Sequence, residues 1–332
     1  MKHSPILLIL ALPLLSTSFV APPPALPLRT SSPFTAPPPL IPPPSFSTSL
    51  SAKPIVNPAS LPPPQTALPL AILVGYAWQV VWSLKDFVAI KQAFGSAFPV
   101  SYPSHLVAAA TGLTGSRFVF RSVTHRPIMY DPSGSLSRAL SFVPRRAAAE
   151  PYRFLSNALL HGDLFHLYFN LSFLRSVIPS LQSLQTPTDL LYSTFLISVI
   201  AGNVACFFTY GARSLTPCVG ASGGIFGLLG LLLVASRRAR ATNLSQNVMR
   251  TAALNFAYGL MSPGISNAAH AGGFAAGIAV GYLGGGKMKK GYQSKRSPYG
   301  GGVYLESARG KVDPVLLLGG VVSAVLLLLR RV

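Results

Sequence analysis

The chain has 332 residues, of which 50% are apolar and 10% are charged. Soluble domains carry about a quarter charged residues, so a soluble globular protein is disfavoured. The 27 lysines and arginines outnumber the 7 acidic residues, but they lie between apolar stretches and form no basic helix with interleaved aromatics. Nucleic-acid binding is therefore disfavoured, and the positive charge is better explained by membrane topology and by contact with anionic lipids of the bilayer.

The N-terminus has the pattern of a targeting sequence. Residues 1–18 combine Lys2 and His3, an apolar stretch too short to cross a bilayer and the small residues Ser16, Thr17 and Ser18, which predicts a signal peptide. Residues 19–66 are rich in proline and serine and contain no acidic residue. They fit either a disordered linker in a secretory-pathway (ER or Golgi) protein or a plastid transit peptide. The Phe19-centred junction resembles targeting sequences of algae with secondary plastids, so we favour a plastid membrane.

Six apolar stretches predict membrane-spanning helices of a multi-pass, all-α protein, and a seventh short one is possible. They are Ala67–Leu84, Leu164–Leu184, Leu190–Tyr210, Cys218–Ser236, Val248–Met261 and Ser266–Gly284, with Pro314–Leu329 as the possible seventh. We therefore expect a main domain over residues 67–284, and a basic linker with a C-terminal helix over residues 285–332. A long, moderately basic loop is expected from Lys85 to about Asn157.

The loops and the cysteines add two expectations. Basic clusters at Arg237–Arg240 and Lys287–Arg296 follow the fourth and sixth spans, so both should lie on one, cytosol-like side. Cys206 and Cys218 make neither a disulfide framework nor a metal site, so we expect free thiols and no metal or cofactor.

Ser222 lies in the sequence Gly220-Ala221-Ser222-Gly223 at the start of an apolar helix. The free N–H groups and the positive dipole end of such a helix can stabilise an anion, and glycines leave room for an approaching peptide backbone. Taken alone, the stretch is better explained by packing between transmembrane helices.

His270 lies inside an apolar span, where a histidine is costly and indicates function by default. Gly273 and Gly277 share roughly one helical face with it and predict a close approach to a partner helix, which a hydrogen bond between His270 and Ser222 would need. The other explanation is a structural histidine bonded to a neighbouring carbonyl.

His161, His166 and Asn170 form a polar run at the start of the second span. His166 and Asn170 are four residues apart on one face and can donate hydrogen bonds at membrane depth. They fit donors to a developing oxyanion, or alternatively polar contacts between helices.

No acidic residue occurs between Asp189 and Glu306. A carboxylate that orients His270 is therefore not expected, and a Ser222–His270 dyad is the simpler hypothesis. Phe226, one helical turn beyond Ser222, is the aromatic surface expected to hold the imidazole.

These motifs resemble the rhomboid family of intramembrane serine proteases, in a eukaryotic form compatible with plastid targeting. The resemblance covers residues 67–284 and rests on Tyr152-Arg153, on His161, His166 and Asn170, on Gly220–Gly223, and on Ala269–Gly277. Tyr152 replaces the usual Trp, and Phe226 stands where Tyr is common.

The resemblance implies a six-helix bundle and a serine endopeptidase that cleaves transmembrane protein substrates. Ser222 would be the nucleophile and His270 the base, with His166, Asn170 and the Ser222 backbone N–H in the oxyanion hole. Gly220 would shape the approach to the nucleophile, and His161 would be structural near the cavity mouth. Two alternatives stay open: a rhomboid-like pseudoprotease that binds clients without cleaving them, and a solute transporter, which the lack of an internal repeat disfavours.

Overall fold

The computed structural model describes residues 60–95, 98, 100–111, 118–121, 127–130, 134–262, 264–292, 303–310 and 312–330. The predicted signal peptide and almost all of the segment 19–66 lie outside these residues.

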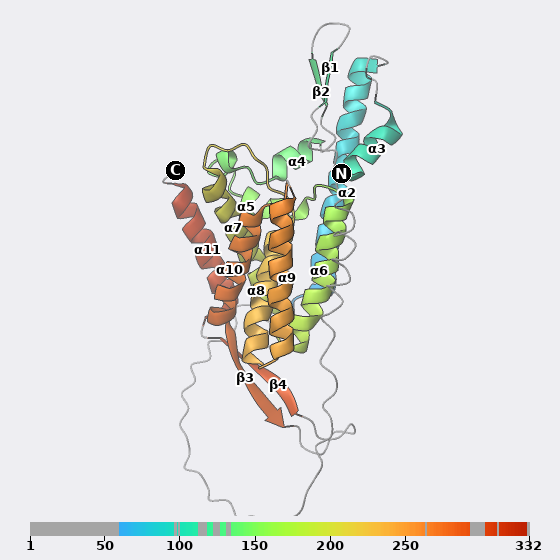
Figure 1. Cartoon of the computed structure of the whole chain (residues 1–332). Helices are drawn as coiled ribbons and strands as arrows, with labels where there is room; N and C mark the ends of the chain where they lie inside the picture. The colour runs from blue at the N-terminus through green and yellow to red at the C-terminus, as the bar shows by residue number, and fades with distance from the viewer. Residues whose placement is uncertain are drawn as a thin grey trace, which may run out of the picture.

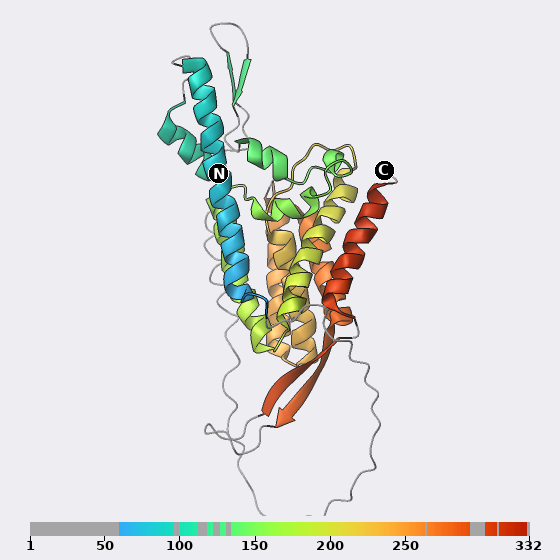
Figure 2. The same ribbon diagram turned by 180° about the vertical axis from the view of Figure 1, so that it is seen from behind.

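The described part of the chain is a bundle of upright helices (Figure 1). Its members are α2 (Pro64–Phe94), α6 (Leu164–Ser183), α7 (Thr188–Tyr210), α8 (Ser222–Arg238), α9 (Thr242–Met261) and α10 (Asn267–Gly284). A seventh helix, α11 (Pro314–Leu329), packs against α7, and Figure 2 shows it from behind at the outer edge of the bundle. The predicted all-α bundle of six helices with a seventh C-terminal helix is confirmed.

Helix α8 occupies the centre of the bundle. Every residue from Gly223 to Ser236 is buried, and α6, α7, α9 and α10 all pack on this helix. A helix that is apolar on all faces must be surrounded by other helices or by lipid. The apolar run that follows Ser222 therefore places the start of α8 inside the protein.

Three predicted boundaries were wrong. Helix α8 begins at Ser222, as expected of the serine that opens an apolar helix, and not at Cys218, where the fourth span was predicted to begin; Cys218 instead forms an isolated backbone bridge to Phe142. Helix α9 begins at Thr242, six residues before the predicted start, so the span is not short. Helix α2 continues beyond Leu84 to Phe94 and projects from the bundle (Figure 1).

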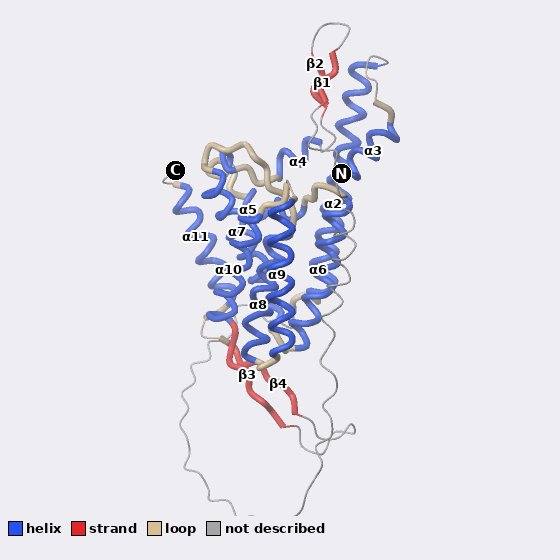
Figure 3. The backbone as a smooth tube through the Cα atoms, viewed as in Figure 1, coloured by secondary structure: helices blue, strands red, loops and turns tan. Residues whose placement is uncertain are grey.

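The predicted loop after α2 contains short elements of secondary structure. These are α3 (Tyr102–Thr111), the antiparallel strands β1 (Phe118–Arg121) and β2 (Pro127–Tyr130), α4 (Gly134–Leu140), the 3₁₀ turn η4 (Pro144–Arg146), α5 (Arg153–Ser156) and η5 (Asn157–Leu159). A second antiparallel hairpin, β3 (Gly285–Tyr292) with β4 (Val303–Arg309), follows α10. Figure 3 shows the two hairpins at opposite ends of the bundle, so neither contributes to its core.

Two of the described helices, α2 and α7, are long and apolar enough to cross a membrane by length and composition. Helix α8 has 17 residues and would span about 26 Å. Helices α6 and α10 carry His166, Asn170 and His270 together with many small residues, which lower their mean hydropathy. The polar candidate residues thus weaken the apolar signal of the helices that hold them.

Arg238, near the end of α8, contacts the end of α10. Its guanidinium donates hydrogen bonds to the carbonyl oxygens of Gly281, at 2.8 Å, and Gly285, at 2.6 Å. These carbonyls belong to the last turn of α10 and the residue after it. The predicted placement of the two basic segments at the same end of the bundle is confirmed.

Candidate active site

Ser222 is the first residue of α8, and the backbone before it lies against two polar side chains. Gly220 has φ +114° and donates its N–H to the Asn157 carbonyl oxygen at 2.9 Å. A Cβ atom on Gly220 would lie 2.6 Å from Cε1 of His166 and 3.7 Å from Nδ2 of Asn170. The absence of a side chain at Gly220 therefore lets the Ser222 segment approach both polar residues of α6.

Gly220→Ala should impair the site more than the fold. The left-handed φ costs any L-residue about 1 kcal/mol, and here the new methyl group would also displace the His166 ring. Gly211→Ala is the matched control, because Gly211 has φ +82° but nothing lies within 4 Å of the position that its methyl group would occupy. We expect both variants to lower the thermal midpoint, Gly220→Ala by more because its methyl group meets the His166 ring, and only Gly220→Ala to reduce strongly the cleavage activity proposed below. Equal turnover in the two variants would contradict the inference that the missing side chain at Gly220 is needed by the site.

His270 lies on α10 and is held by aromatic rings. Its imidazole stacks on Phe226 of α8, with ring centroids 4.1 Å apart and an interplanar angle of 9°. Phe256 of α9 approaches the same imidazole edge-on at 6.5 Å. The stacking expected for Phe226 is present, and it fixes the imidazole plane beside the helix that begins with Ser222.

Glycines bring α10 into backbone contact with α8. A Cβ atom on Gly273 would overlap the Gly223 carbonyl group, and one on Gly277 would overlap that of Gly227. The close approach predicted from these glycines is therefore present. It brings His270 to α8 without any side chain between the two backbones.

His166 and Asn170 lie one turn apart at the start of α6. The side chain of Asp163 caps this helix by accepting the His166 backbone N–H at 2.7 Å. The Asp163 carboxylate is thus bound to the backbone of α6. Nδ1 of His166 accepts the N–H of Gly162 at 3.4 Å. Nδ2 of buried Asn170 has no hydrogen-bond partner among the described residues. A free donor thus lies beside Gly220.

His161 is fully buried beside His166. The two rings meet edge to face at 5.1 Å, and neither ring nitrogen of His161 has a partner in the described part of the chain. Burial, reinforced by the neighbouring His166, lowers the pKa of His161 to about 3, so its ring is neutral. The side-chain amide of Gln79 on α2 makes two hydrogen bonds with the His161 backbone. Its oxygen accepts the His161 N–H at 3.0 Å, and its nitrogen donates to the His161 carbonyl oxygen at 2.8 Å. We did not foresee this role of Gln79 from the sequence.

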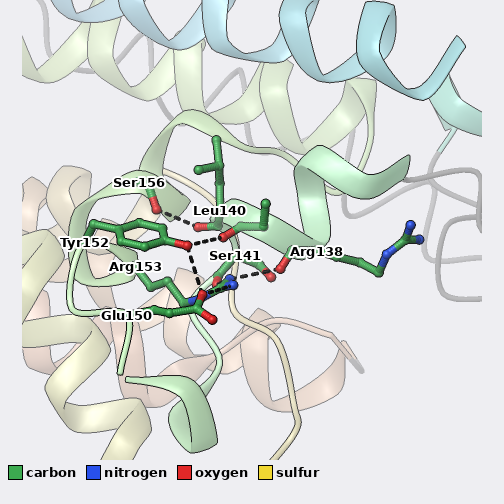
Figure 4. A network of polar contacts seen from close by, with 8 residues as sticks. Arg138, Leu140, Ser141, Glu150, Tyr152, Arg153 and Ser156 are labelled. Atoms are coloured by element: carbon green, nitrogen blue, oxygen red, sulfur yellow. Dashed lines mark hydrogen bonds and ion pairs between the residues drawn. The ribbon is translucent and has the colours of Figure 1, made fainter. Parts of the chain in front are cut away.

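Arg153 organises the segment that leads into the site (Figure 4). Its buried guanidinium donates to the carbonyl oxygens of Arg138, at 2.9 Å, and Ser141, at 2.7 Å, and pairs with Glu150. The hydroxyl of half-exposed Tyr152 also donates to Glu150, at 2.9 Å. The sequence marked Tyr152-Arg153 only as a family motif. A buried arginine that satisfies two carbonyl groups is a structural link between α4 and α5.

The Glu150 pair makes an acid-sensitive contribution to stability. Hydrogen bonds from Tyr152 and then Arg153 hold the pKa of the Glu150 carboxyl below its usual value of 4.5. A carboxyl whose pKa is lower in the folded than in the unfolded state stabilises the folded state at pH values above its unfolded-state pKa. This contribution disappears as the pH falls through the folded-state pKa. We expect wild type to have a higher thermal midpoint than Glu150→Gln near neutral pH, and the difference to shrink below about pH 4.5. A difference independent of pH would exclude this contribution.

A pair of buried amides joins the segment before α6 to α7 and to the serine. Nδ2 of Asn203 donates to Oδ1 of Asn157 at 2.8 Å and to the Phe154 carbonyl oxygen at 2.9 Å. The Asn157 carbonyl oxygen accepts the Gly220 N–H. This pair therefore positions the backbone immediately before Ser222, and no local motif in the sequence signalled it.

The fold and the site define a class of protein: a multi-pass helical bundle with a serine at the start of its central buried helix and a histidine stacked on that helix. Residues 148–287 match the family model of the Rhomboid domain. This stretch of the chain is therefore a rhomboid domain. A rhomboid domain indicates an integral membrane protein.

Three curated relatives agree with this match. The chain is similar to "Rhomboid protease GluP" of Bacillus subtilis, with 31% identity over 40% of this chain and 26% of the relative. It is 30% identical to "Inactive RHOMBOID-like protein 8" of Arabidopsis thaliana, over 48% of this chain and 46% of the relative. It is 28% identical to "RHOMBOID-like protein 5" of the same plant, over 47% and 52%. The matched region thus spans a quarter to a half of the length of these relatives.

Proposed function

We propose that this protein is an intramembrane serine endopeptidase that cleaves transmembrane segments of other proteins through a Ser222–His270 dyad. The observation that carries the proposal is the stacking of His270 on Phe226, one turn beyond Ser222 on the same helix. A histidine fixed in this way can act repeatedly on a neighbouring hydroxyl, which acyl transfer requires.

The reaction begins with proton transfer from Ser222 to His270 and attack of the serine oxygen on the substrate carbonyl. Negative charge then develops on the carbonyl oxygen. His166, the unpaired amide of Asn170 and the backbone N–H at the start of α8 are the donors available to stabilise it. His270 returns its proton to the leaving amine, and a water activated by the same imidazole releases the acyl group.

A third catalytic carboxylate is not part of this proposal. The chain contains no acidic residue from 190 to 305, and Asp163 caps α6. Phe226 and Phe256 hold the imidazole through ring contacts instead. This arrangement avoids placing an ionised carboxylate in the apolar interior, where it would be costly.

The substrate helix should reach the site between α6 and α9. Both helices carry exposed apolar side chains: Phe165 and Tyr168 on α6, and Leu260 and Met261 on α9. Peptide bonds in a transmembrane helix are already hydrogen-bonded internally, so the substrate must unwind before attack. Substrates with helix-weakening Gly or Pro near the scissile bond should therefore be preferred.

The test combines cleavage with covalent labelling. The full chain, reconstituted in liposomes, is given a fluorescent single-span substrate and, separately, a fluorophosphonate that reacts with activated serines. We expect cleavage within or at the edge of the substrate's span, and a label that peptide mapping assigns to Ser222. Labelling at another serine, or cleavage that continues after complete labelling of Ser222, would overturn the assignment.

The alternative is a rhomboid-like pseudoprotease that retains client helices without cleaving them. It is favoured by the similarity to a relative whose name describes it as inactive. This chain carries both Ser222 and His270, which disfavours it. Stable binding of a helix-weakened substrate, with neither cleavage nor labelling of Ser222, would decide for the alternative.

We also propose a plastid membrane as the location, with the ER or Golgi as the alternative. The proposal rests on residues 1–66, which combine a signal-peptide pattern with an acid-free, proline- and serine-rich stretch. A fluorescent reporter fused to these residues should enter the plastid of an alga with secondary plastids. Retention of the reporter in the ER would favour the alternative.

A further inference from the structure

The two cysteines of the chain meet at the end of the bundle that holds the site. Cys206 lies in the last turns of α7, and Cys218 lies in the extended segment four residues before Ser222. Their Sγ atoms are 3.4 Å apart, and both thiols are free and buried. The predicted free thiols are therefore present, but the sequence did not indicate that they touch.

Each cysteine is also connected to one half of the candidate site. The backbone of Cys218 exchanges two hydrogen bonds with Phe142, N–H to carbonyl, at 2.8 and 3.0 Å. The sulfur of Cys206 lies 3.1 Å from Oγ of Ser266. Ser266 caps α10 by accepting the Ala269 N–H at 3.2 Å, one residue before His270. The thiol pair thus lies between the segment that leads to Ser222 and the cap of the helix that carries His270.

We propose that Cys206 and Cys218 form a redox modification site, which a peroxide oxidises to an intramolecular disulfide. We further propose that this disulfide slows the reaction at the neighbouring site, and this second part rests on the proposed function.

The oxidation has a balanced course. One cysteine, as thiolate, attacks a peroxide oxygen; the O–O bond breaks, a sulfenic acid forms and the first water leaves. The second cysteine, as thiolate, attacks the sulfenic sulfur; the S–S bond forms, the S–O bond breaks and the second water leaves. Two thiols lose two electrons and two protons, and one hydrogen peroxide is reduced to two waters. Hydrogen peroxide is small and uncharged, which suits a buried pair.

The disulfide would change the contacts of α10. An S–S bond requires the two sulfur atoms to approach from 3.4 Å to about 2.0 Å. This shift moves the Cys206 sulfur relative to the Ser266 hydroxyl, which accepts a hydrogen bond from Tyr210 at 2.9 Å. The cap of α10 is then held differently, and the segment before Ser222 becomes covalently tied to α7. Both changes act on the relative position of Ser222 and His270.

The first test needs no enzymatic activity. The full chain in liposomes is treated with hydrogen peroxide, denatured, and analysed by thiol counting and mass spectrometry. We expect both thiols to disappear together, with loss of two hydrogen atoms and a linked peptide pair containing Cys206 and Cys218. In Cys206→Ser and Cys218→Ser the remaining thiol should yield a trappable sulfenic acid. Separate oxidation of the two thiols to sulfinic acids in wild type, or survival of both thiols, would overturn the site.

The second test measures turnover of the model substrate. Oxidised wild type should cleave severalfold more slowly and recover with dithiothreitol, whereas peroxide should leave the turnover of both single-serine variants unchanged, because neither can form the disulfide. Unchanged turnover in fully disulfide-bonded protein would overturn the coupling. If the reduced protein shows no peptidase activity at all, the proposed function fails, while the mass measurement still decides the disulfide.

Discussion

Ser222→Ala and His270→Ala should each reduce cleavage of a membrane substrate to a similar, low residual level. The nucleophile and its base act as one unit, so removal of either forfeits the same covalent step. We expect kcat to fall by roughly 10³-fold or more, equivalent to about 4 kcal/mol of transition-state stabilisation. The double variant should be no slower than the single variants. The measurement is initial cleavage rate in liposomes at saturating substrate.

A matched control separates catalysis from packing. His105 is also a buried histidine stacked on a phenylalanine, with its ring centroid 4.4 Å from that of Phe87, but it lies on α3 outside the bundle. His105→Ala should lower the thermal midpoint and leave kcat close to wild type. If His105→Ala lost as much activity as His270→Ala, impaired folding would explain the loss in both variants, and His270 would have no demonstrated catalytic role. Undiminished cleavage by Ser222→Ala would refute the dyad.

Gly277→Ala should have the largest effect on stability. Its methyl group would overlap the Gly227 carbonyl group, and both α8 and α10 would have to shift to accommodate it. Overpacking of a tight interior typically costs about 1–3 kcal/mol, and backbone overlap leaves no flexible side chain to move. Because α10 carries His270, the separation of the two helices should also reduce turnover.

Gly319→Ala is the comparison for this variant. Gly319 lies in α11, and nothing lies within 4 Å of the position that its methyl group would occupy. Replacing an unobstructed helical glycine by alanine is neutral or favourable by up to about 1 kcal/mol. Thermal unfolding in lipid nanodiscs should therefore show a clear fall for Gly277→Ala and none for Gly319→Ala. Equal midpoints would contradict the close contact of α8 and α10.

Much of the bundle was predictable because hydrophobic length and single polar residues are local signals. The six helices and α11 follow from apolar stretches, and Ser222, His270, His166 and Asn170 stand out because polar groups at membrane depth are costly. The glycines of α8 and α10 predicted a close helix pair for the same local reason, since only residues without side chains allow such an approach.

The boundaries and supporting contacts were not predictable, because they depend on partners distant in the chain. Cys218 has the sequence context of an apolar span, yet its pairing with Phe142 keeps it extended and delays α8 to Ser222. Gln79 holds the His161 backbone across 82 positions, and Asn203 meets Asn157 across 46. No local pattern distinguishes such amides from other polar residues.

The amino-acid sequence alone predicted the membrane class and the helical bundle, because these depend on composition and on the length of apolar stretches. It named the residues of the candidate site through short motifs and their resemblance to a known family. How those residues are held became visible in the folded chain: the imidazole on Phe226, the Gly220 backbone against His166, the Arg153 network and the contact of the two thiols. Each of these is a contact between segments that only the packing of the bundle brings together.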